Sequence, residues 1–230
     1  AEGLHGTIQV LMSQINIVYQ DSEILIINKP AGLSVLIEGW DKDAPYLIKM
    51  LEEQLGRIWV VHRIDKITSG IMVFALTAES HRSLNIKFEK HQVEKTYHAI
   101  LNGAPKWDDK VTKFPLRADV GHKHRTMVDN RSGVRSETRF KILARYPSST
   151  LVEAMPMTGR THQIRVHAYA LGYPLLGDVL YSAPETEVIQ RPALHAYSLK
   201  LTHPNTNEMM TFQAVYPDDF QTAMNALRGK

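Results

Sequence analysis

The sequence predicts an α+β fold built on a mixed, mostly antiparallel sheet. Many short apolar or alternating runs read as strands, only a few segments have helical spacing, and the two kinds rarely alternate along the chain. A parallel doubly wound sheet requires regular alternation of strands and helices, so it fits poorly. We expect one continuous sheet in a single domain at residues 16–230, after a short amino-terminal extension at residues 1–15.

The expected strands follow the apolar and alternating runs in chain order. They cover residues 16–19, 24–28, 58–61, 71–76, 94–101, 136–144, 150–155, 194–201 and 209–215.

Three helices are expected between and after these strands. The first follows Thr77, an N-cap residue with Glu79 in the first turn, where an acid interacts favourably with the helix dipole. The second runs from about Thr161 to a stop at Gly172, and the third covers the tail after Pro217.

Composition restricts the chemistry. The 230 residues are 43% hydrophobic and include no cysteine, which excludes disulfides, thiolate nucleophiles and cysteine-ligated metals. No stretch approaches the ~18 apolar residues of a membrane span, and the first residues lack the pattern of a signal peptide. We therefore expect a soluble, cytoplasmic protein with no membrane association.

The net charge of +3 is small, but its distribution is uneven. Residues 122–135 carry four lysine and arginine side chains against a lone Asp129, and residues 155–167 carry two arginines and no acid. Residues 38–53, by contrast, hold five carboxylates. This segregation favours a basic face that meets a polyanion, although a solvated charged surface is the commoner meaning of any single cluster.

The segment VVHRIDKITSGIMVFAL at residues 60–76 places Asp65 in a polar link between two apolar runs. Thr68 and Ser69 can hydrogen-bond the backbone of such a turn, and Gly70 permits backbone angles that a side chain would forbid. Asp65 thus has two interpretations, a turn-forming carboxylate or a catalytic group on a loop held by strands.

The segment MPMTGRTHQIRVHAYALG at residues 155–172 reads as a strand end, a glycine turn and a helix. His162, Arg165 and Tyr169 share one face of that helix by spacing. If Arg165 points inward it needs an acidic partner, because an unpaired buried guanidinium is destabilising, and Asp65 is the expected one. The alternative is an ordinary amphipathic helix with a solvated Arg165.

Several catalytic classes lack their signatures in this chain. His162 and His167 are five residues apart, roughly 140° around a helix, and no HExxH motif accompanies them. Neither a phosphate-binding glycine loop nor a GxSxG nucleophile elbow occurs. We expect no metal and no cofactor.

Three segments together resemble a known family. HRIDKITSG at residues 62–70 resembles the HRLDxxTSG motif of the RluA family of pseudouridine synthases. EKTYHAIL at residues 94–101 is similar to the family's lysine–x–tyrosine motif, and TGRTHQIRVHAYALGYPLLGD at residues 158–178 is similar to its arginine motif. Ile64 and Ile164 stand where leucine is usual and keep an apolar packing role.

Two further segments extend the resemblance to about residues 17–217. INKPAGLSV at residues 27–35 matches an early segment of the family, and LHAYSLKLTHP at residues 194–204 matches a late one. Five motifs in the family's order are far more specific than any one of them. Several members carry an amino-terminal S4 RNA-binding domain, for which we expect no counterpart here, and this difference leaves the RNA target open.

The resemblance implies the pseudouridine synthase fold, a bent sheet with a catalytic cleft across it, and isomerisation of uridine in RNA to pseudouridine. The reaction involves no redox change and needs no cofactor. By resemblance, Asp65 is the essential group, either adding covalently to the nucleoside or removing a ribose proton. Tyr97 is implied to stack on the target uracil and to assist proton removal from carbon 5, and Arg165 is implied to pair with Asp65. The plainer interpretation of Tyr97 is a core aromatic of its strand.

RNA contacts are expected from polar side chains around these motifs. They are His62, Arg63, Thr68, Lys29, Arg160, His162, Lys123 and Arg125. The expected partner is large-subunit rRNA, tRNA or both, bound by a monomer. Two other functions stay open: a non-catalytic RNA-binding protein with a synthase-like fold, and an RNA-cleaving enzyme that uses His162 and His195 as acid and base.

Overall fold

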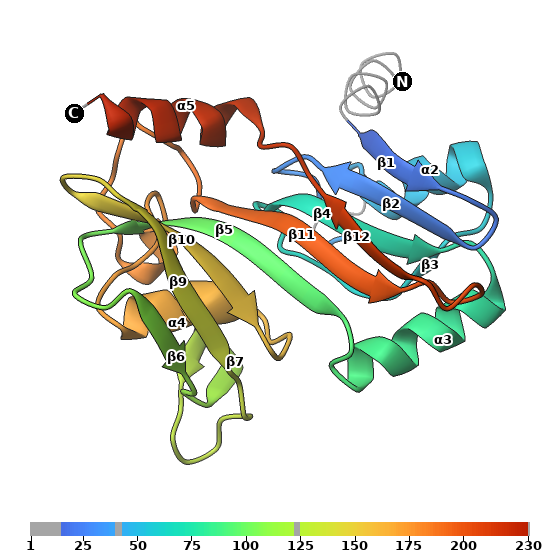
Figure 1. The fold of residues 1–230 in the computed structure, drawn as a ribbon, viewed down its shortest axis with the longest axis horizontal. Helices are drawn as coiled ribbons and strands as arrows, with labels where there is room; N and C mark the ends of the chain where they lie inside the picture. Colours follow the sequence, from blue (N-terminus) through green and yellow to red (C-terminus); the bar gives the residue numbers. More distant parts are fainter. Residues whose placement is uncertain (1–14, 40–42, 122–124, 230) are drawn as a thin grey trace. The chain divides into compact units, whose positions relative to one another are not determined.

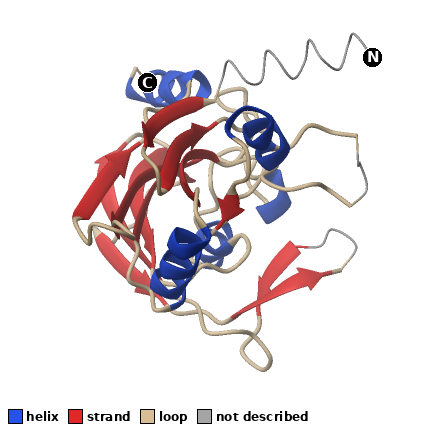
Figure 2. Cartoon of the chain, turned by 90° about the vertical axis from the view of Figure 1, so that its right-hand side faces the viewer, coloured by secondary structure: helices blue, strands red, loops and turns tan. Residues whose placement is uncertain are grey.

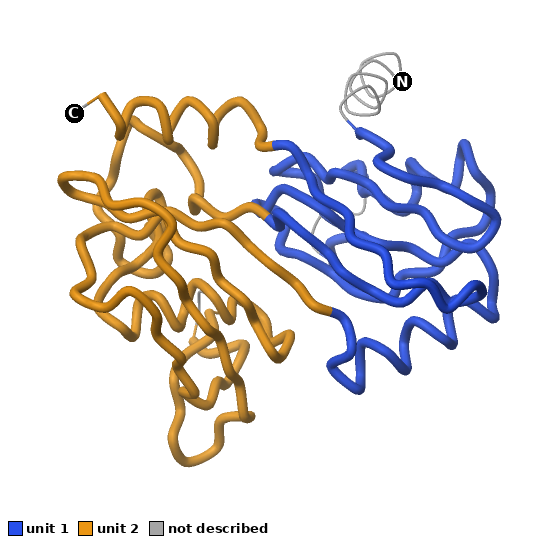
Figure 3. Tube along the Cα trace, viewed as in Figure 1, with its two compact units in different colours: residues 1–93, 196–215 blue, residues 94–195, 216–230 orange. Residues whose placement is uncertain are grey.

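The computed structural model describes residues 15–39, 43–121 and 125–229 (Figure 1). Lys123 and all but the last residue of the expected extension at residues 1–15 lie outside the described residues. The chain divides into two compact units, coloured separately in Figure 3. Unit 1 comprises residues 1–93 and 196–215, and unit 2 comprises residues 94–195 and 216–230.

Unit 1 is built on strands in the order β1-β2-β4-β11, with β12 beside β11 and β3 beside β4. The β1–β2, β2–β4, β3–β4 and β11–β12 pairs run antiparallel. The central strand β4 is buried at every position. The bounds are β1 Asn16–Gln20, β2 Ile24–Lys29, β3 Trp59–Val60, β4 Ser69–Ala75, β11 Leu194–Thr202 and β12 Met209–Gln213.

Two helices belong to unit 1. Helix α3 (Ala78–Glu89) begins as expected, since the Thr77 side chain accepts a 3.1 Å hydrogen bond from the backbone N–H of Ser80. Helix α2 (Leu47–Leu55) is not among the helices that the sequence predicts. It buries an apolar stripe that begins at Leu47 and Ile48.

Unit 2 contains strands in the order β5-β10-β9-β6, and the described pairs are antiparallel. A separate two-stranded pair is formed by β7 and β8 (Figure 2). The sequence did not predict β6, β7 or β8, which are short and mostly exposed and so lack a clear apolar pattern. The bounds are β5 Glu94–Asn102, β6 Asp109–Thr112, β7 Leu116–Val120, β8 Arg125–Val128, β9 Thr138–Arg145 and β10 Ser149–Pro156.

The helices of unit 2 are α4 (Gln163–Ala170), the single 3-10 turn η1 (Val179–Tyr181) and α5 (Asp218–Arg228). The chain leaves α4 at Gly172, whose φ of +87° favours glycine, so the expected stop is confirmed. The expected helix after Pro217 is also confirmed as α5, whose apolar face packs in a cluster with Ile100 and Leu151. A second cluster joins α4 through Ile164 and Ala168 to the β-strands of this unit.

These elements confirm the predicted α+β class with a mostly antiparallel sheet. All nine predicted strands and all three predicted helices are present, with ends that differ by at most a few residues. Within the described ranges, no helix has both the length and the apolar character that crossing a membrane requires.

Candidate active site

Asp65 lies in the link between β3 and β4 of unit 1 and is partly buried. Its backbone carbonyl accepts a 3.0 Å hydrogen bond from the N–H of Thr68, which closes a tight turn. Thr68 and Ser69 are only 2% and 1% exposed. Gly70 has φ +121°, and a Cβ placed there would collide with the backbone of Ala196. The turn is therefore fixed to β4, and it presents Asp65 from a rigid base.

His62 anchors the start of the same link. Its ring Nε2 accepts a 3.1 Å hydrogen bond from the backbone N–H of Val73 in β4. The ring also stacks on Phe88 of α3, with 4.7 Å between the ring centroids. These contacts give His62 a positioning role, and its expected contact with RNA stays a prediction. Arg63, the next residue, is exposed.

Lys29 has a different place from the one expected. It is 0% exposed, and its ammonium group donates to three backbone carbonyls at 2.8, 2.8 and 3.0 Å, those of Pro30, Leu33 and Lys66. The Lys66 carbonyl also accepts a 2.8 Å hydrogen bond from the N–H of Gly32. A buried ammonium so bonded is not available as a surface phosphate contact. Instead Lys29 ties the early motif to the backbone next to Asp65.

Arg165 is buried in unit 2 at 2% exposure, so the alternative of a solvated arginine on an amphipathic helix is wrong. Its Nε donates to Oδ2 of Asp178 at 2.7 Å, and its Nη2 donates to Oδ1 at 2.8 Å. The guanidinium also lies 5.0 Å from the centroid of the Tyr181 ring. The required acidic partner is thus present as Asp178. The expected pairing with Asp65, which belongs to unit 1, stays a prediction.

The turn before α4 is held by a buried amide. Gln163 Oε1 accepts from the Thr158 hydroxyl at 2.6 Å and from the Arg160 N–H at 3.1 Å. Its Nε2 donates to the Glu137 carbonyl and the Thr138 hydroxyl, each at 2.9 Å. The amide is therefore fully used, and it fixes the backbone from Thr158 to the first turn of α4.

His162 occupies the N-cap position of α4 in the left-handed conformation, with φ 53°. Its Nδ1 lies 2.9 Å from the Tyr181 hydroxyl. That hydroxyl accepts from the N–H of Thr126 at 3.0 Å and donates to the Thr126 carbonyl at 3.1 Å. Tyr181 thus connects η1, α4 and β8, and His162 is part of this connection.

Tyr97 lies on β5 opposite Ala154 of β10 and is half-buried against the cluster that includes Ala99. This position suits either a core aromatic or a side chain that reaches a ligand. On the same strand, Lys95 donates a 3.4 Å hydrogen bond to the Thr158 carbonyl, and burial lowers its pKa. The lysine–x–tyrosine motif therefore contacts the glycine turn before α4.

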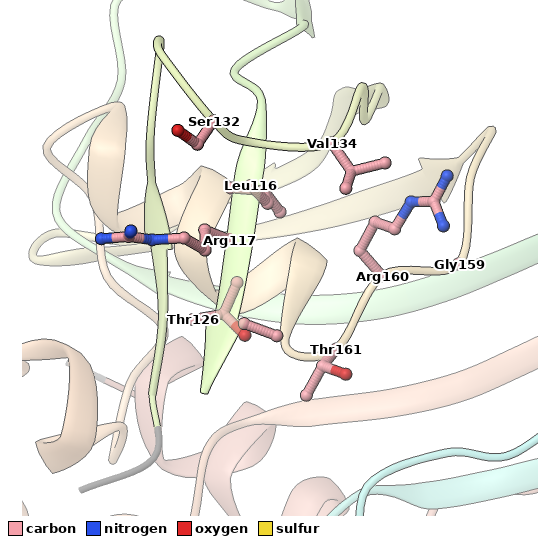
Figure 4. A pocket seen from close by; sticks show the side chains of 9 residues that line it. Leu116, Arg117, Thr126, Ser132, Val134, Gly159, Arg160 and Thr161 are labelled. Carbon is pink, nitrogen blue, oxygen red and sulfur yellow. The ribbon is translucent and has the colours of Figure 1, made fainter. Parts of the chain in front are cut away.

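A pocket of about 260 Å³ lies in unit 2 between the β7–β8 pair and this turn (Figure 4). Thr126, Ser132 and Val134 from one basic segment and Arg160 from the other take part in lining it. The two segments expected to share a basic face are therefore neighbours. Arg160 is exposed, and Arg125 is partly buried at the start of β8.

Sequence reasoning missed several residues of this arrangement, chiefly Asp178, Tyr181, Gln163 and Lys95. Asp178 closes the GYPLLGD end of the arginine motif, and an acid thirteen residues after a buried arginine was the available signal. Tyr181 had no such signal, because its hydroxyl contacts depend on the loop that brings η1 to β8.

Comparisons with known proteins identify relatives of this chain. A family model described as RNA pseudouridylate synthase matches residues 23–170, a span that contains Asp65, Tyr97 and Arg165. The dual-specificity RNA pseudouridine synthase RluA of Haemophilus influenzae is 39% identical over 202 residues, which are 87% of this chain and 92% of that protein.

Two further comparisons extend the likeness. The ribosomal large subunit pseudouridine synthase D of Neisseria meningitidis serogroup A is 35% identical over 93% of this chain, but the match spans only 61% of that protein. The solved structure of human RNA pseudouridylate synthase domain containing 4 superposes with a TM-score of 0.77 at 25% identity, covering 98% of this chain.

The fold and the motif set define an RNA-modifying isomerase. The chain belongs to the RNA pseudouridylate synthase family and, within it, to the RluA-type enzymes. It is an RNA pseudouridine synthase, as the motif resemblance predicted.

Proposed function

We propose that this enzyme isomerises uridines in both rRNA and tRNA, with Asp65 as the essential catalytic group. The rigid turn that presents Asp65 supports this proposal most directly: Thr68 closes it, Gly70 fits it to its neighbour strand and Lys29 ties down the adjacent backbone.

The chemistry assigned to Asp65 follows from the reaction. The bond from ribose to the base nitrogen breaks, the uracil rotates, and a new bond forms through carbon 5. Asp65 either adds covalently to the nucleoside or removes a ribose proton, and both routes require the ionised carboxylate. We assign Tyr97 to the uracil, by stacking and by assisting proton removal from carbon 5. Arg165 would favour and orient the charged form of Asp65.

The substrate must leave its stacked position before it can react. Flipping a base out of an RNA stem costs a few kcal/mol, which contacts in the pocket must offset. We assign part of this binding to the basic segments around Arg125 and Arg160. We also propose that the protein acts as a monomer in the cytoplasm. Affinity should then fall with salt, with a slope near −0.7 to −0.9 per neutralised phosphate.

The relatives favour dual specificity for rRNA and tRNA. The relatives named as dual-specificity enzymes in Haemophilus influenzae and Escherichia coli are covered over 92% and 93% of their length. The synthase D of Neisseria meningitidis is covered over 61%. The chain therefore matches almost the whole length of the dual-specificity enzymes but only about three fifths of the synthase D.

Carbodiimide primer-extension mapping tests the proposal. Unmodified rRNA and tRNA transcripts are incubated separately with the wild type, with Asp65→Asn and with Asp108→Asn, a control at a carboxylate whose side chain is 92% exposed. We expect new stops in both RNAs with the wild type and the control, and none with Asp65→Asn, which should still bind RNA. Turnover by Asp65→Asn would overturn the catalytic assignment, and stops in one RNA alone would overturn dual specificity. Salt-sensitive binding without any stop would favour the non-catalytic RNA-binding alternative.

A further inference from the structure

We propose that the pocket between the β7–β8 pair and the turn before α4 binds a backbone phosphate of the substrate RNA, with Thr126 as a specific ligand. This inference rests on the proposed function, because it concerns how the RNA is held. It concerns a part of unit 2 that does not include Asp65, Tyr97 or Arg165.

The first observation is an unused hydroxyl. Thr126 is 1% exposed and lines the pocket, yet within the described ranges its Oγ1 has no hydrogen-bond partner. Its backbone N–H and carbonyl are both bonded to the Tyr181 hydroxyl, so the residue is held in place. A buried hydroxyl without a partner is destabilising, and such a group in a binding protein is explained when a ligand completes its bond.

The second observation is the charge around the pocket. Arg117 and Arg160 both line it, and Figure 4 shows them extending to opposite sides of the other labelled residues. Arg160 is exposed, and its Nε makes a long 3.5 Å contact with the Arg135 carbonyl. The guanidinium retains further donors that suit a phosphate oxygen.

The acids near the pocket are already engaged. Asp129 accepts from the N–H groups of Arg131 and Ser132, each at 2.9 Å, and pairs with Arg117 at 3.1 Å. These bonds lower the pKa of Asp129, first through the two backbone donors and then through the Arg117 charge. The remaining charge is positive, since described residues 113–137 hold five lysine and arginine side chains against two aspartates and Glu137, which pairs with Lys113 and Arg135.

The size and lining of the pocket favour a phosphate with part of its sugar. About 260 Å³ exceeds the space that a bare anion fills, and apolar surface from Leu116 and Val134 lies beside the hydroxyls of Thr126 and Thr161. Hydroxyl and arginine donors of this kind make the phosphate contacts that set the register of an RNA without reading its sequence.

Two isosteric substitutions separate this role from a structural one. Thr126→Val removes the buried hydroxyl of this pocket-lining residue. Thr112→Val is the matched control, because Thr112 is 4% exposed, its Oγ1 also lacks a partner among the described residues, and it does not line the pocket. Neither change should lower the melting temperature, since each removes an unpaired buried hydroxyl.

The readout is the dissociation constant for an unmodified tRNA or rRNA stem-loop that contains the target uridine. We expect Thr126→Val to weaken binding about tenfold, the effect of one hydrogen bond to a charged group, and Thr112→Val to leave it unchanged. Arg160→Ala should also weaken binding and reduce the slope of log affinity against log salt by about 0.7–0.9.

A set of RNAs with one phosphate neutralised at a time, as the methylphosphonate, identifies the bound group. At one position the substitution should weaken the wild type but not Thr126→Val. Equal affinities of Thr126→Val and Thr112→Val for RNA would overturn the proposal. A second result would also overturn it: inorganic phosphate stabilises the wild type but not Thr126→Val, while the two proteins bind RNA with the same affinity. Because the readout is binding, it holds even if Asp65→Asn retains turnover, so the two proposals fail separately.

Discussion

Arg165 and Asp178 form a bidentate ion pair inside unit 2, with N–O distances of 2.7 and 2.8 Å and side chains only 3% and 1% exposed. The pair joins α4 to the residue before η1, and the Tyr181 ring covers the guanidinium. Because both side chains are buried, the attraction between the two charges must offset the free energy lost when each is removed from water.

Removal of the acid from this pair should therefore destabilise the enzyme strongly. For Asp178→Asn we expect a loss of about 3–5 kcal/mol in the free energy of unfolding, the usual effect of leaving a buried charge without its partner. Asp109→Asn is the control, since Asp109 makes a comparable pair with Arg139 at the surface. Denaturant unfolding measures both variants, and similar losses in the two would contradict the importance of burial.

Arg165→Ala should lower both stability and turnover, because Asp178 is left unpaired and the proposed support for Asp65 is lost. The decisive comparison is with Asp178→Asn, which keeps the arginine. If Arg165 acts only through the fold, the two variants lose turnover in proportion to their loss of stability. A larger loss of turnover in Arg165→Ala, at equal stability, is the result expected for a residue that also supports Asp65.

Lys29→Met tests the buried ammonium beneath the Asp65 turn. The change leaves the carbonyls of Pro30, Leu33 and Lys66 without this donor. We expect a loss of about 3 kcal/mol in stability and about a tenfold or greater fall in kcat from misplacement of the neighbouring aspartate. Lys66→Met is the control, because its side chain is 46% exposed and pairs with Glu38. A rise in the KM for RNA with kcat unchanged would contradict this positioning role.

Gly70→Ala tests the rigidity of the same turn. At φ +121° an L residue is strained, and the new Cβ would collide with the Ala196 backbone. The expected loss is roughly 3 kcal/mol or more, with turnover lost in parallel. Gly39→Ala, where nothing lies within 4 Å of the added Cβ, should change neither. A melting temperature of Gly70→Ala equal to that of the wild type would show that the turn adjusts to the added Cβ without loss of stability.

His98 gives a testable pH dependence. It is buried on β5 beside the Tyr216 hydroxyl, and burial lowers its pKa from the usual value of 6.5 to about 4. Between these values the unfolded chain binds a proton that the folded chain does not. The contribution of His98 is therefore complete above pH 6.5 and is lost as the pH falls towards 4.

Melting temperatures measured from pH 7 down to about pH 4 check this contribution. The melting temperature of His98→Gln should fall less steeply with decreasing pH than that of the wild type, because the variant lacks a group that takes up a proton when the protein unfolds. His81→Gln, a change on the partly buried helix α3, is the comparison. Parallel curves for the wild type and His98→Gln would exclude His98 as a source of acid sensitivity.

Local patterns in the sequence determined the strands, the three expected helices and the family. Alternating and apolar runs marked strands because their period is set by the strand itself, and Thr77 and Gly172 marked helix ends because caps are local hydrogen-bonding and backbone effects. The five motifs placed Asp65, Tyr97 and Arg165 in the catalytic role by resemblance, and the family match spans all three.

Tertiary contacts decided what the side chains of those motifs touch. The Lys29 ammonium donates to two nearby carbonyls, of Pro30 and Leu33, and to that of the distant Lys66, which only the fold brings to it. The pairing of Arg165 with Asp178 depends on the loop between them. Likewise, the proposed role of the unpaired Thr126 hydroxyl depends on the pocket that the turn before α4 helps to form. A residue's type and spacing state which partners it can accept, but burial and charge pairing are set by which distant segments the fold brings to it.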